Sequence, residues 1–255
     1  MSTPKKAFLQ EKGNGRLGVE ESDLYRILRL RGIEVELFTE KRIRRRQLDL
    51  ARDVLVAGSI PVVLGALRQL GVEPPEPNDY PRCLARHLHR RVWTSTIRQV
   101  TAIILNDELH PVFVKPIGRM KRFTGAVVHT RDELWRFQGA SLRLPVFCSE
   151  PVDWLTEHRA YVASGKIVGI KHYLGDPDVE LDEDVVAAAV AELENSNEAV
   201  AGYALDFGVL STGVTALVEM NDGFSLGSYD LDPSAYTDLI TARWMEITGS
   251  ARKTG

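Results

Sequence analysis

The sequence predicts a two-part protein, with a small N-terminal parallel α/β domain followed by a larger α+β part. Strand and helix patterns alternate over the first 70 residues, which is typical of a parallel sheet with crossover helices. A segment with three prolines, 72–80 (VEPPEPNDY), then breaks the pattern and is typical of a linker. After it, two pairs of strand-like segments are each joined at a glycine, which indicates antiparallel hairpins. We therefore place the domains at residues 1–80 and 81–255.

The elements of the first domain follow from the spacing of apolar residues. Residues 21–31 carry apolar side chains at helical spacing and stop before a glycine. Residues 33–38 (IEVELF) alternate apolar and acidic side chains, as a half-buried strand does. Residues 53–57 (DVLVA) indicate a buried strand, and a helix follows over 59–70. This order predicts a small parallel sheet.

The second part begins with a basic segment, 81–105, for which we expect mainly helix. Further along, the pattern predicts strands at 112–115, 126–129 and 145–148, a short helix after the capping box 130–133 (TRDE), and helices at 182–194 and 233–247. The glycine-bounded basic segment between the first two of these strands is expected to be a loop.

Composition excludes several functional classes. The chain is 44% hydrophobic and 26% charged, as ordinary globular proteins are, and its net charge of −3 gives no general attraction to nucleic acid or to an anionic membrane. Cys83 and Cys148 lack metal-site spacing and are expected to be reduced thiols. The start has no signal-peptide core, and the longest apolar run, 54–67, is broken by glycine and proline. We expect a cytoplasmic protein without nucleic acid or membrane partners.

Oxygen-bearing side chains gather in the last hairpin, 203–221 (YALDFGVLSTGVTALVEMN). If its strands turn at Thr212-Gly213, Asp206 lies opposite Glu219, and Asn221 shares the face of Glu219. Two opposed carboxylates destabilise a sheet, and Mg²⁺ between them removes that penalty. The hairpin therefore predicts a magnesium site. The alternative is a pair of solvated acids, and a change of register by one residue would scatter the set.

An earlier hairpin, turning at Ser164-Gly165, carries Glu157, Arg159 and Tyr161 on one strand face. Lys171 lies on the returning strand. A turn of two or of three residues decides whether Lys171 shares the face of Arg159, and both remain open. These residues form either a binding surface or a cross-strand salt bridge.

A third set of charged residues begins with Lys115, at the end of a short strand. The loop that follows, 117–125 (IGRMKRFTG), carries Arg119, Lys121 and Arg122. Cationic side chains and flexible backbone N–H groups are what polyphosphate needs, although a solvated basic loop is the alternative. The Walker pattern GxxxxGK[ST] is absent.

In their order along the chain, these segments resemble the ATP-grasp superfamily from about Pro81 to Ile247. The resemblance is carried by FVKP, VFCSEPV, EHRAYV and DFGVLSTGVTALVEMN. It implies an ATP-grasp fold of two α+β subdomains that hold ATP between them, preceded by a pre-ATP-grasp α/β domain. The similarity is greatest to small stand-alone members thought to join amino acids or peptides.

The resemblance also implies which residues bind the nucleotide. Lys115 would hold the α and β phosphates, and Lys121 would contact phosphate from the lid loop, although the usual glycine-rich form of that loop is replaced here by RMKRFTG. Glu150 and Val152 would meet adenine through the main chain. Glu157 would bind the ribose hydroxyls.

The remaining implied roles concern catalysis and metal binding. Arg159 and Lys171 would contact the triphosphate or an acyl phosphate. Asp206, Glu219 and Asn221 would bind Mg²⁺, with Mn²⁺ as an alternative ion. Some amino-acid ligases carry an arginine just before the metal aspartate, and this chain has none there. Recognition of a substrate carboxylate must then come from elsewhere.

The activity that the resemblance implies is an ATP-dependent carboxylate–amine ligation. A carboxylate attacks the γ-phosphate to form an acyl phosphate and ADP, and an amine then displaces phosphate to form an amide. The acceptor is a free amino acid, a peptide or a protein, and the chain is a monomer or a homodimer. The alternatives are an ATP-dependent phosphotransferase on the same fold and a non-catalytic nucleotide-binding module.

Overall fold

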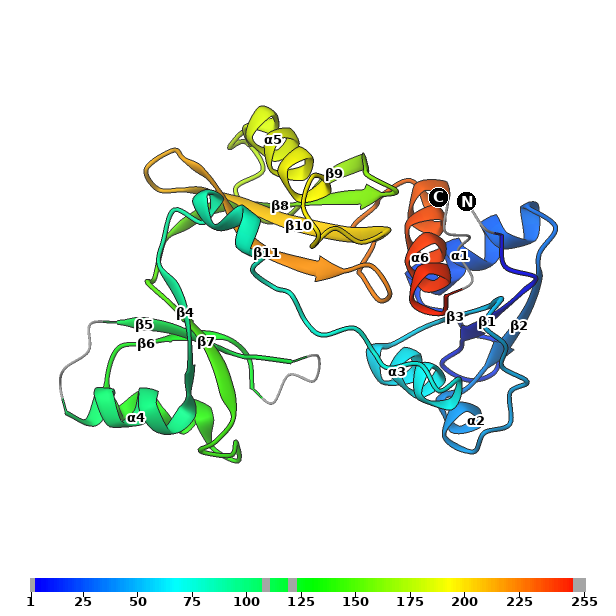
Figure 1. Ribbon diagram of the computed structural model, residues 1–255, viewed down its shortest axis with the longest axis horizontal. Coiled ribbons are helices and arrows are strands. Elements are labelled where there is room, and N and C mark those ends of the chain that lie inside the picture. Colours follow the sequence, from blue (N-terminus) through cyan, green and yellow to red (C-terminus); the bar gives the residue numbers. More distant parts are fainter. Residues whose placement is uncertain (1–2, 107–110, 119–122, 250–255) are drawn as a thin grey trace.

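The computed structural model describes residues 3–106, 111–118 and 123–249, which form three sheets (Figure 1). One is a parallel sheet of three strands near the N-terminus, and the others are antiparallel sheets of four strands each. This mixture confirms the predicted fold class.

The N-terminal sheet has the strand order β2-β1-β3. Its strands and helices are β1 (Lys6–Gln10), α1 (Val19–Leu30), β2 (Glu34–Phe38), α2 (Glu40–Arg44), β3 (Val54–Ala57) and α3 (Ile60–Gln69). The chain moves from β1 to one neighbour and then crosses to the other side of β1. The carboxyl ends of β1 and β3 therefore lie at the point where the strand order reverses.

The first antiparallel sheet has the order β4-β7-β5-β6 and carries α4 on one side (Figure 1). Its elements are β4 (Val92–Thr96), α4 (Ile97–Leu105), β5 (Val112–Pro116), β6 (Ala126–Val128), the 3₁₀ helix η2 (Arg131–Phe137) and β7 (Pro145–Ser149). The predicted capping box is present at the start of η2.

The prediction of helix through most of residues 81–105 is wrong. The 3₁₀ helix η1 (Arg82–His87) comes first, and β4 then precedes α4. The β4 residues Val92, Trp93 and Thr94 are β-branched or aromatic and favour a strand. Thr96 ends this strand and caps α4, because its side chain and that of Gln99 form a reciprocal capping box.

The second antiparallel sheet has the order β11-β10-β8-β9. Its strands are β8 (Trp154–Ala163), β9 (Lys166–Gly175), β10 (Gly202–Leu210) and β11 (Thr215–Asp222), and α5 (Glu183–Glu194) covers one face (Figure 1). Beneath α5, apolar side chains such as Leu193, Leu205 and Phe207 form a buried core. The opposite face is left for other contacts.

The last helix, α6 (Pro233–Ile247), lies between this sheet and the N-terminal domain (Figure 1). The indole Nε1 of Trp244 donates a 2.8 Å hydrogen bond to the carbonyl of Val54, and one apolar core includes Leu55, Tyr161 and Leu239. The end of the chain thus packs on its beginning, and the division at residue 80 stays a proposal.

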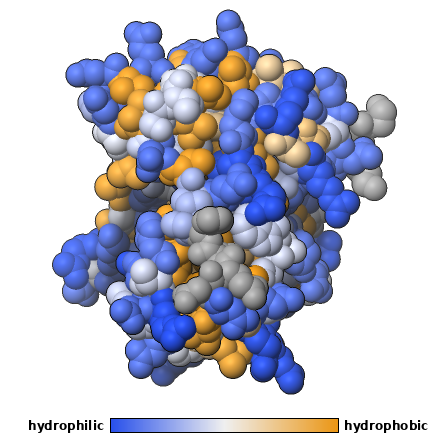
Figure 2. Space-filling view, turned by 90° about the vertical axis from the view of Figure 1, so that its left-hand side faces the viewer, coloured by the Kyte–Doolittle hydropathy of each residue, from blue (hydrophilic) through white to orange (hydrophobic). Residues whose placement is uncertain are grey.

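Apolar side chains are scattered over the face of the molecule shown in Figure 2, where hydrophilic ones divide them. Within the described ranges, no helix is long and apolar enough to cross a membrane.

Candidate active site

Four charged side chains form a row across the β8–β11 sheet. Lys171 pairs with Arg159, Arg159 pairs with Asp206, and Asp206 pairs with Glu219. Residues paired directly across antiparallel strands point to the same face. Their neighbours along β8 and β10, such as Ala160, belong to the core beneath α5, so the row lies on the other face.

A β-bulge aligns the acidic end of the row. Near the turn, Phe207 pairs with Leu217, and this register would place Val218 opposite Asp206. The bulge leaves Val218 without a partner in the ladder and brings Glu219 opposite Asp206 instead. The predicted opposition of the two carboxylates is therefore observed.

The turn that the sequence predicts for this hairpin is wrong. Val209 pairs with Thr215, and the Gly213 N–H donates to the carbonyl of Leu210, so the turn spans residues 211–214 rather than two residues. The longer turn and the bulge shift the register in compensating directions.

A second bulge decides the position of Lys171. Ala163 pairs with Lys166, so the β8–β9 turn has two residues. That register alone would place Lys171 opposite His158. The shift between Tyr161 and Val162 moves Lys171 opposite Arg159, which settles the question that the sequence left open.

Arg159 and Asp206 form a bidentate ion pair in the middle of the row. Both hydrogen bonds, Nε to Oδ1 and Nη2 to Oδ2, measure 2.7 Å, and the residues are 8% and 2% exposed. Burial raises the pKa of Asp206, while Arg159 acts in the opposite direction. The guanidinium also lies 5.6 Å and 5.1 Å from the ring centres of Tyr173 and Tyr229. The pair is well satisfied in this state.

Lys115 reaches the acidic end of the row from β5. Its Nζ lies 2.5 Å from Glu219 Oε2 and 2.7 Å from Asp79 Oδ2. Burial by itself lowers the pKa of this ammonium, but the charges of Glu219 and Asp79 outweigh burial and raise it. Lys115 is therefore a fixed cation held between the two antiparallel sheets.

A cavity of about 350 Å³ opens beside Lys115 between these sheets. Its lining combines aromatic side chains with the main chain that follows β7: Tyr80, Arg90, Phe113, Lys115, Gly125, Ala126, Val127, Ser149, Glu150, Pro151, Val152, Trp154, Val218 and Glu219. An apolar slot with a cation at one end suits a flat base that carries phosphates.

The main chain at the edge of this cavity is partly occupied. The Glu150 N–H donates to the carbonyl of Arg91 at 3.1 Å, and the Glu150 carboxylate accepts from the Arg91 N–H at 2.9 Å. Within the described part of the chain, no hydrogen bond engages the main chain of Val152. Val152 is therefore better placed than Glu150 to donate to a base.

The three oxygen-bearing residues predicted to hold a metal lie together. Asn221 Nδ2 donates to Asp206 Oδ2 at 3.0 Å and to Glu219 Oε1 at 3.3 Å. Two carboxylates and an amide oxygen are ligands that Mg²⁺ accepts, so the set fits the ion once Asn221 turns its oxygen inward. Among the described residues, no group of three His, Cys, Asp or Glu side chains is arranged for a metal. Lys121 lies outside the described residues.

A family model described as an ATP-grasp domain, the second family of its clade, matches residues 87–239. The chain belongs to this ATP-grasp family. Comparison with curated proteins gives no match.

Solved structures share the fold of this ATP-grasp protein. D-alanine–D-alanine ligase from Bacillus anthracis, complexed with ATP, is 15% identical with a TM-score of 0.57, over 97% of this chain and 99% of that one. A RimK domain ATP-grasp protein from Sphaerobacter thermophilus DSM 20745 is 17% identical with a TM-score of 0.53, over 95% and 98%. Macrocyclase MdnC from Microcystis aeruginosa MRC, bound with precursor peptide MdnA, is 11% identical with a TM-score of 0.53, over 92% and 99%.

Several residues of the ATP-grasp cavity were not predicted as site residues. Asp79 and Tyr80 end the proline-rich segment taken as a linker, and the Asp79 carbonyl accepts from the Met220 N–H at 2.8 Å. Arg90 donates to the carbonyls of Leu217 at 2.7 Å and of Val218 at 2.9 Å, where the bulge exposes them. Their only signal in the sequence was an acidic and an aromatic residue directly after a run of prolines.

Asp79→Asn is expected to tighten ATP binding by about three- to tenfold, because phosphate must displace the Asp79 carboxylate from Lys115. Calorimetric titration with ATP measures this change. Asp53→Asn, which breaks the exposed ion pair with Lys5 elsewhere, is the matched control. Weaker ATP binding in Asp79→Asn would show that the carboxylate helps rather than competes.

Glu157 is expected to make ATP binding sensitive to pH. Burial raises the pKa of its carboxyl above the ordinary 4.5, while the 2.7 Å hydrogen bond from the Tyr173 hydroxyl lowers it. Because the ionised form accepts ribose hydroxyls best, ATP affinity should fall on acidification, beginning at a pH above that of an ordinary glutamate. Titrations between about pH 7 and pH 5 measure this. Glu157→Gln should remove the dependence, and an identical pH profile in that variant would contradict the assignment.

Proposed function

We propose that this ATP-grasp protein is an ATP-dependent ligase that activates a carboxylate as an acyl phosphate and couples it to an amine, with release of ADP and phosphate. The observation that supports this most is the row Lys171, Arg159, Asp206 and Glu219, which meets Lys115 at its acidic end. Cations and carboxylates in alternation suit a transferring phosphoryl group and its metal ion.

In this proposal each residue has a limited task. Lys115 and Lys121 bind phosphate oxygens, and Val152 and Glu157 orient the base and the ribose. Asp206, Glu219 and Asn221 would hold Mg²⁺, which neutralises charge on the phosphates when bound. These roles extend the geometry by analogy with the family.

Arg159 and Lys171 are assigned to the reacting end of the nucleotide. Both are cations on one sheet face, and each stabilises negative charge that develops on the transferring phosphoryl group. Closure of the site around the acyl phosphate would exclude water, which otherwise hydrolyses it.

The proposal is tested by incubating the protein with ATP, Mg²⁺ and pooled amino acids and peptides. ADP, free phosphate and a new amide mass are expected in equal amounts, and ADP should fall sharply when the amine is omitted. Phosphate attached to an acceptor would indicate a phosphotransferase instead. ATP binding without ADP in any pool would indicate a non-catalytic module.

A further inference from the structure

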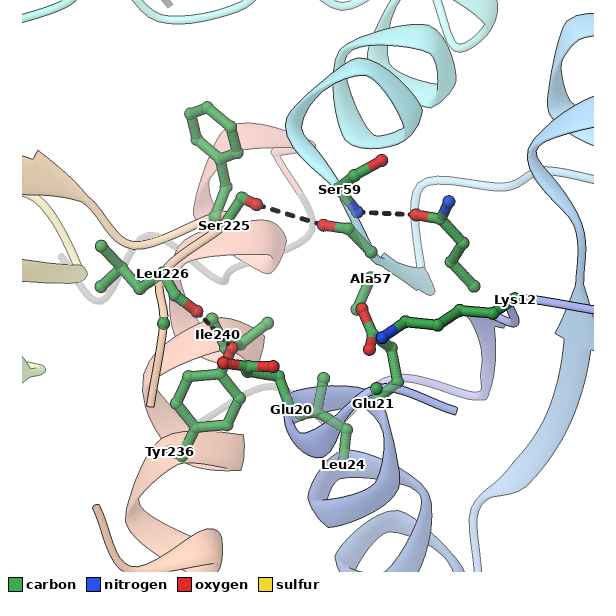
Figure 3. A pocket seen from close by; sticks show the side chains of 15 residues that line it. Lys12, Glu20, Glu21, Leu24, Ala57, Ser59, Ser225, Leu226, Tyr236 and Ile240 are labelled. Atoms are coloured by element: carbon green, nitrogen blue, oxygen red, sulfur yellow. Dashed lines mark hydrogen bonds between the residues drawn. The ribbon is translucent and has the colours of Figure 1, made fainter. Parts of the chain in front are cut away.

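A second cavity of about 350 Å³ lies where the N-terminal domain meets the end of the chain (Figure 3). Its walls come from the end of β1, the start of α1, the end of β3, the segment after β11, and α6: Gln10, Lys12, Gly18, Glu20, Glu21, Leu24, Ala57, Gly58, Ser59, Phe224, Ser225, Leu226, Gly227, Tyr236 and Ile240. The cavity is distinct from the one beside Lys115.

The position of this cavity in the sheet is typical of a ligand site. In open parallel sheets, ligands bind outside the carboxyl ends of the strands, where the strand order reverses. In the order β2-β1-β3 that point lies between β1 and β3. Gln10 ends β1, and Gly58 follows β3, so both lie at the reversal and both line the cavity.

The neutral polar groups of the walls are largely satisfied by one another. The Ser59 N–H donates to Gln10 Oε1 at 2.7 Å, and Ser225 Oγ donates to the Gly58 carbonyl at 3.1 Å (Figure 3). Tyr236 donates its hydroxyl to the Leu226 carbonyl at 2.7 Å. These contacts hold the walls in place and leave the charged side chains as the groups that select a ligand.

The charged side chains that line the cavity give it an excess of negative charge. Glu20 and Glu21 carry carboxylates, whereas Lys12 carries the one ammonium among the lining residues (Figure 3). Burial raises the pKa of Glu21, and Lys12 acts in the opposite direction. Glu20 accepts a long hydrogen bond of 3.4 Å from the Ser228 N–H. A cation would balance this charge, and a second carboxylate-bearing ligand would be repelled.

The rest of the lining is apolar. Leu24, Leu226 and Ile240 are contributed by α1, the segment after β11 and α6, and Phe224 adds an aromatic ring. The volume is at the lower end of the range for small-molecule sites. A small molecule with an ammonium group and an apolar body therefore matches the cavity in size, charge and surface.

We infer that this cavity binds the amine substrate of the ligation, and that Glu20 and Glu21 recognise its ammonium group. The inference rests on the proposed function. The Gly227 carbonyl, on the cavity wall, accepts a 2.6 Å hydrogen bond from the hydroxyl of Tyr161, which lies two residues beyond Arg159 on the same strand face. One wall of the cavity thus contacts the sheet face that carries the charged row.

Binding of matched cations and anions to the full chain tests the inference without ATP. The cations are the amides of L-alanine, L-leucine and L-phenylalanine, and the anions are the N-acetyl derivatives of the same amino acids. Calorimetric titration should show that at least one amide binds and that its N-acetyl counterpart binds at least about tenfold more weakly. Equal or tighter binding of the anions, or no binding of any amide, would overturn the inference.

Variants locate the binding. Glu20→Gln and Glu21→Gln should each weaken amide binding by about tenfold, since each loses a charge but keeps its shape, and Gln retains hydrogen-bonding capacity at the start of α1. Glu34→Gln, an exposed residue of the same domain, should leave it unchanged. Unchanged binding in both cavity variants would overturn the inference. ATP affinity and ADP formation are measured separately, so amide binding without ADP would refute the ligase and leave the cavity assignment standing.

Discussion

Glu219→Gln is expected to lower the rate of ADP formation by about a thousandfold while the protein stays folded. Glu219 ends the charged row, contacts Lys115 and lies beside Asn221. Loss of its charge removes one of two carboxylates proposed to hold the metal. Its side chain is 30% exposed, so its loss strands no buried group, and Lys115 keeps Asp79 as a partner.

The change is measured as the initial rate of ADP release with saturating Mg-ATP, together with the midpoint of thermal unfolding. Glu180→Gln, an exposed residue of the same half of the chain, is the matched control and should retain full activity. A Glu219→Gln variant within about twofold of the native rate would remove Glu219 from the metal site.

Asp206→Ala is expected to lower the free energy of unfolding by about 3–5 kcal/mol, in addition to abolishing ADP formation. The substitution leaves the guanidinium of Arg159 buried without its bidentate partner. A buried charge that has lost its partner is costly, whereas replacing both partners by apolar groups is much less so. The stability effect and the catalytic effect of Asp206 are thus separable.

Urea denaturation of a double-mutant cycle makes that separation. The double variant Asp206→Ala/Arg159→Met should recover at least half of the lost stability, yet it should remain inactive. If Asp206→Ala alone costs less than about 1 kcal/mol, Arg159 is not held by this ion pair in solution.

The row of charged residues shows how far sequence reasoning reaches. The opposition of Asp206 and Glu219 followed from the alternation of strand residues, but it was reached through a wrong turn that a bulge at Val218 offsets. The position of Lys171 depended on another bulge. A bulge is stabilised by contacts from outside the hairpin, such as those of Arg90 with β11 carbonyls, and a single hairpin sequence does not contain them.

The other errors also come from contacts between distant parts of the chain. Residues 72–80 have the composition of a linker, yet Asp79 and Tyr80 lie beside the nucleotide cavity because the Asp79 carbonyl bonds to Met220 across the fold. The packing of α6 on β3 joins the two ends of the chain. Local patterns predicted most strands and helices correctly, whereas the cavities are formed by elements that only the tertiary fold brings together.

A crystal structure of the protein with Mg²⁺ and a non-hydrolysable ATP analogue tests the central claim most directly. We expect the base between Val152 and Trp154, the phosphates in contact with Lys115 and Arg159, and the metal bound by Asp206 and Glu219. Nucleotide density away from Lys115, or phosphates bound without a metal at these two carboxylates, would contradict the assignment of this sheet face as the site of ATP-dependent chemistry.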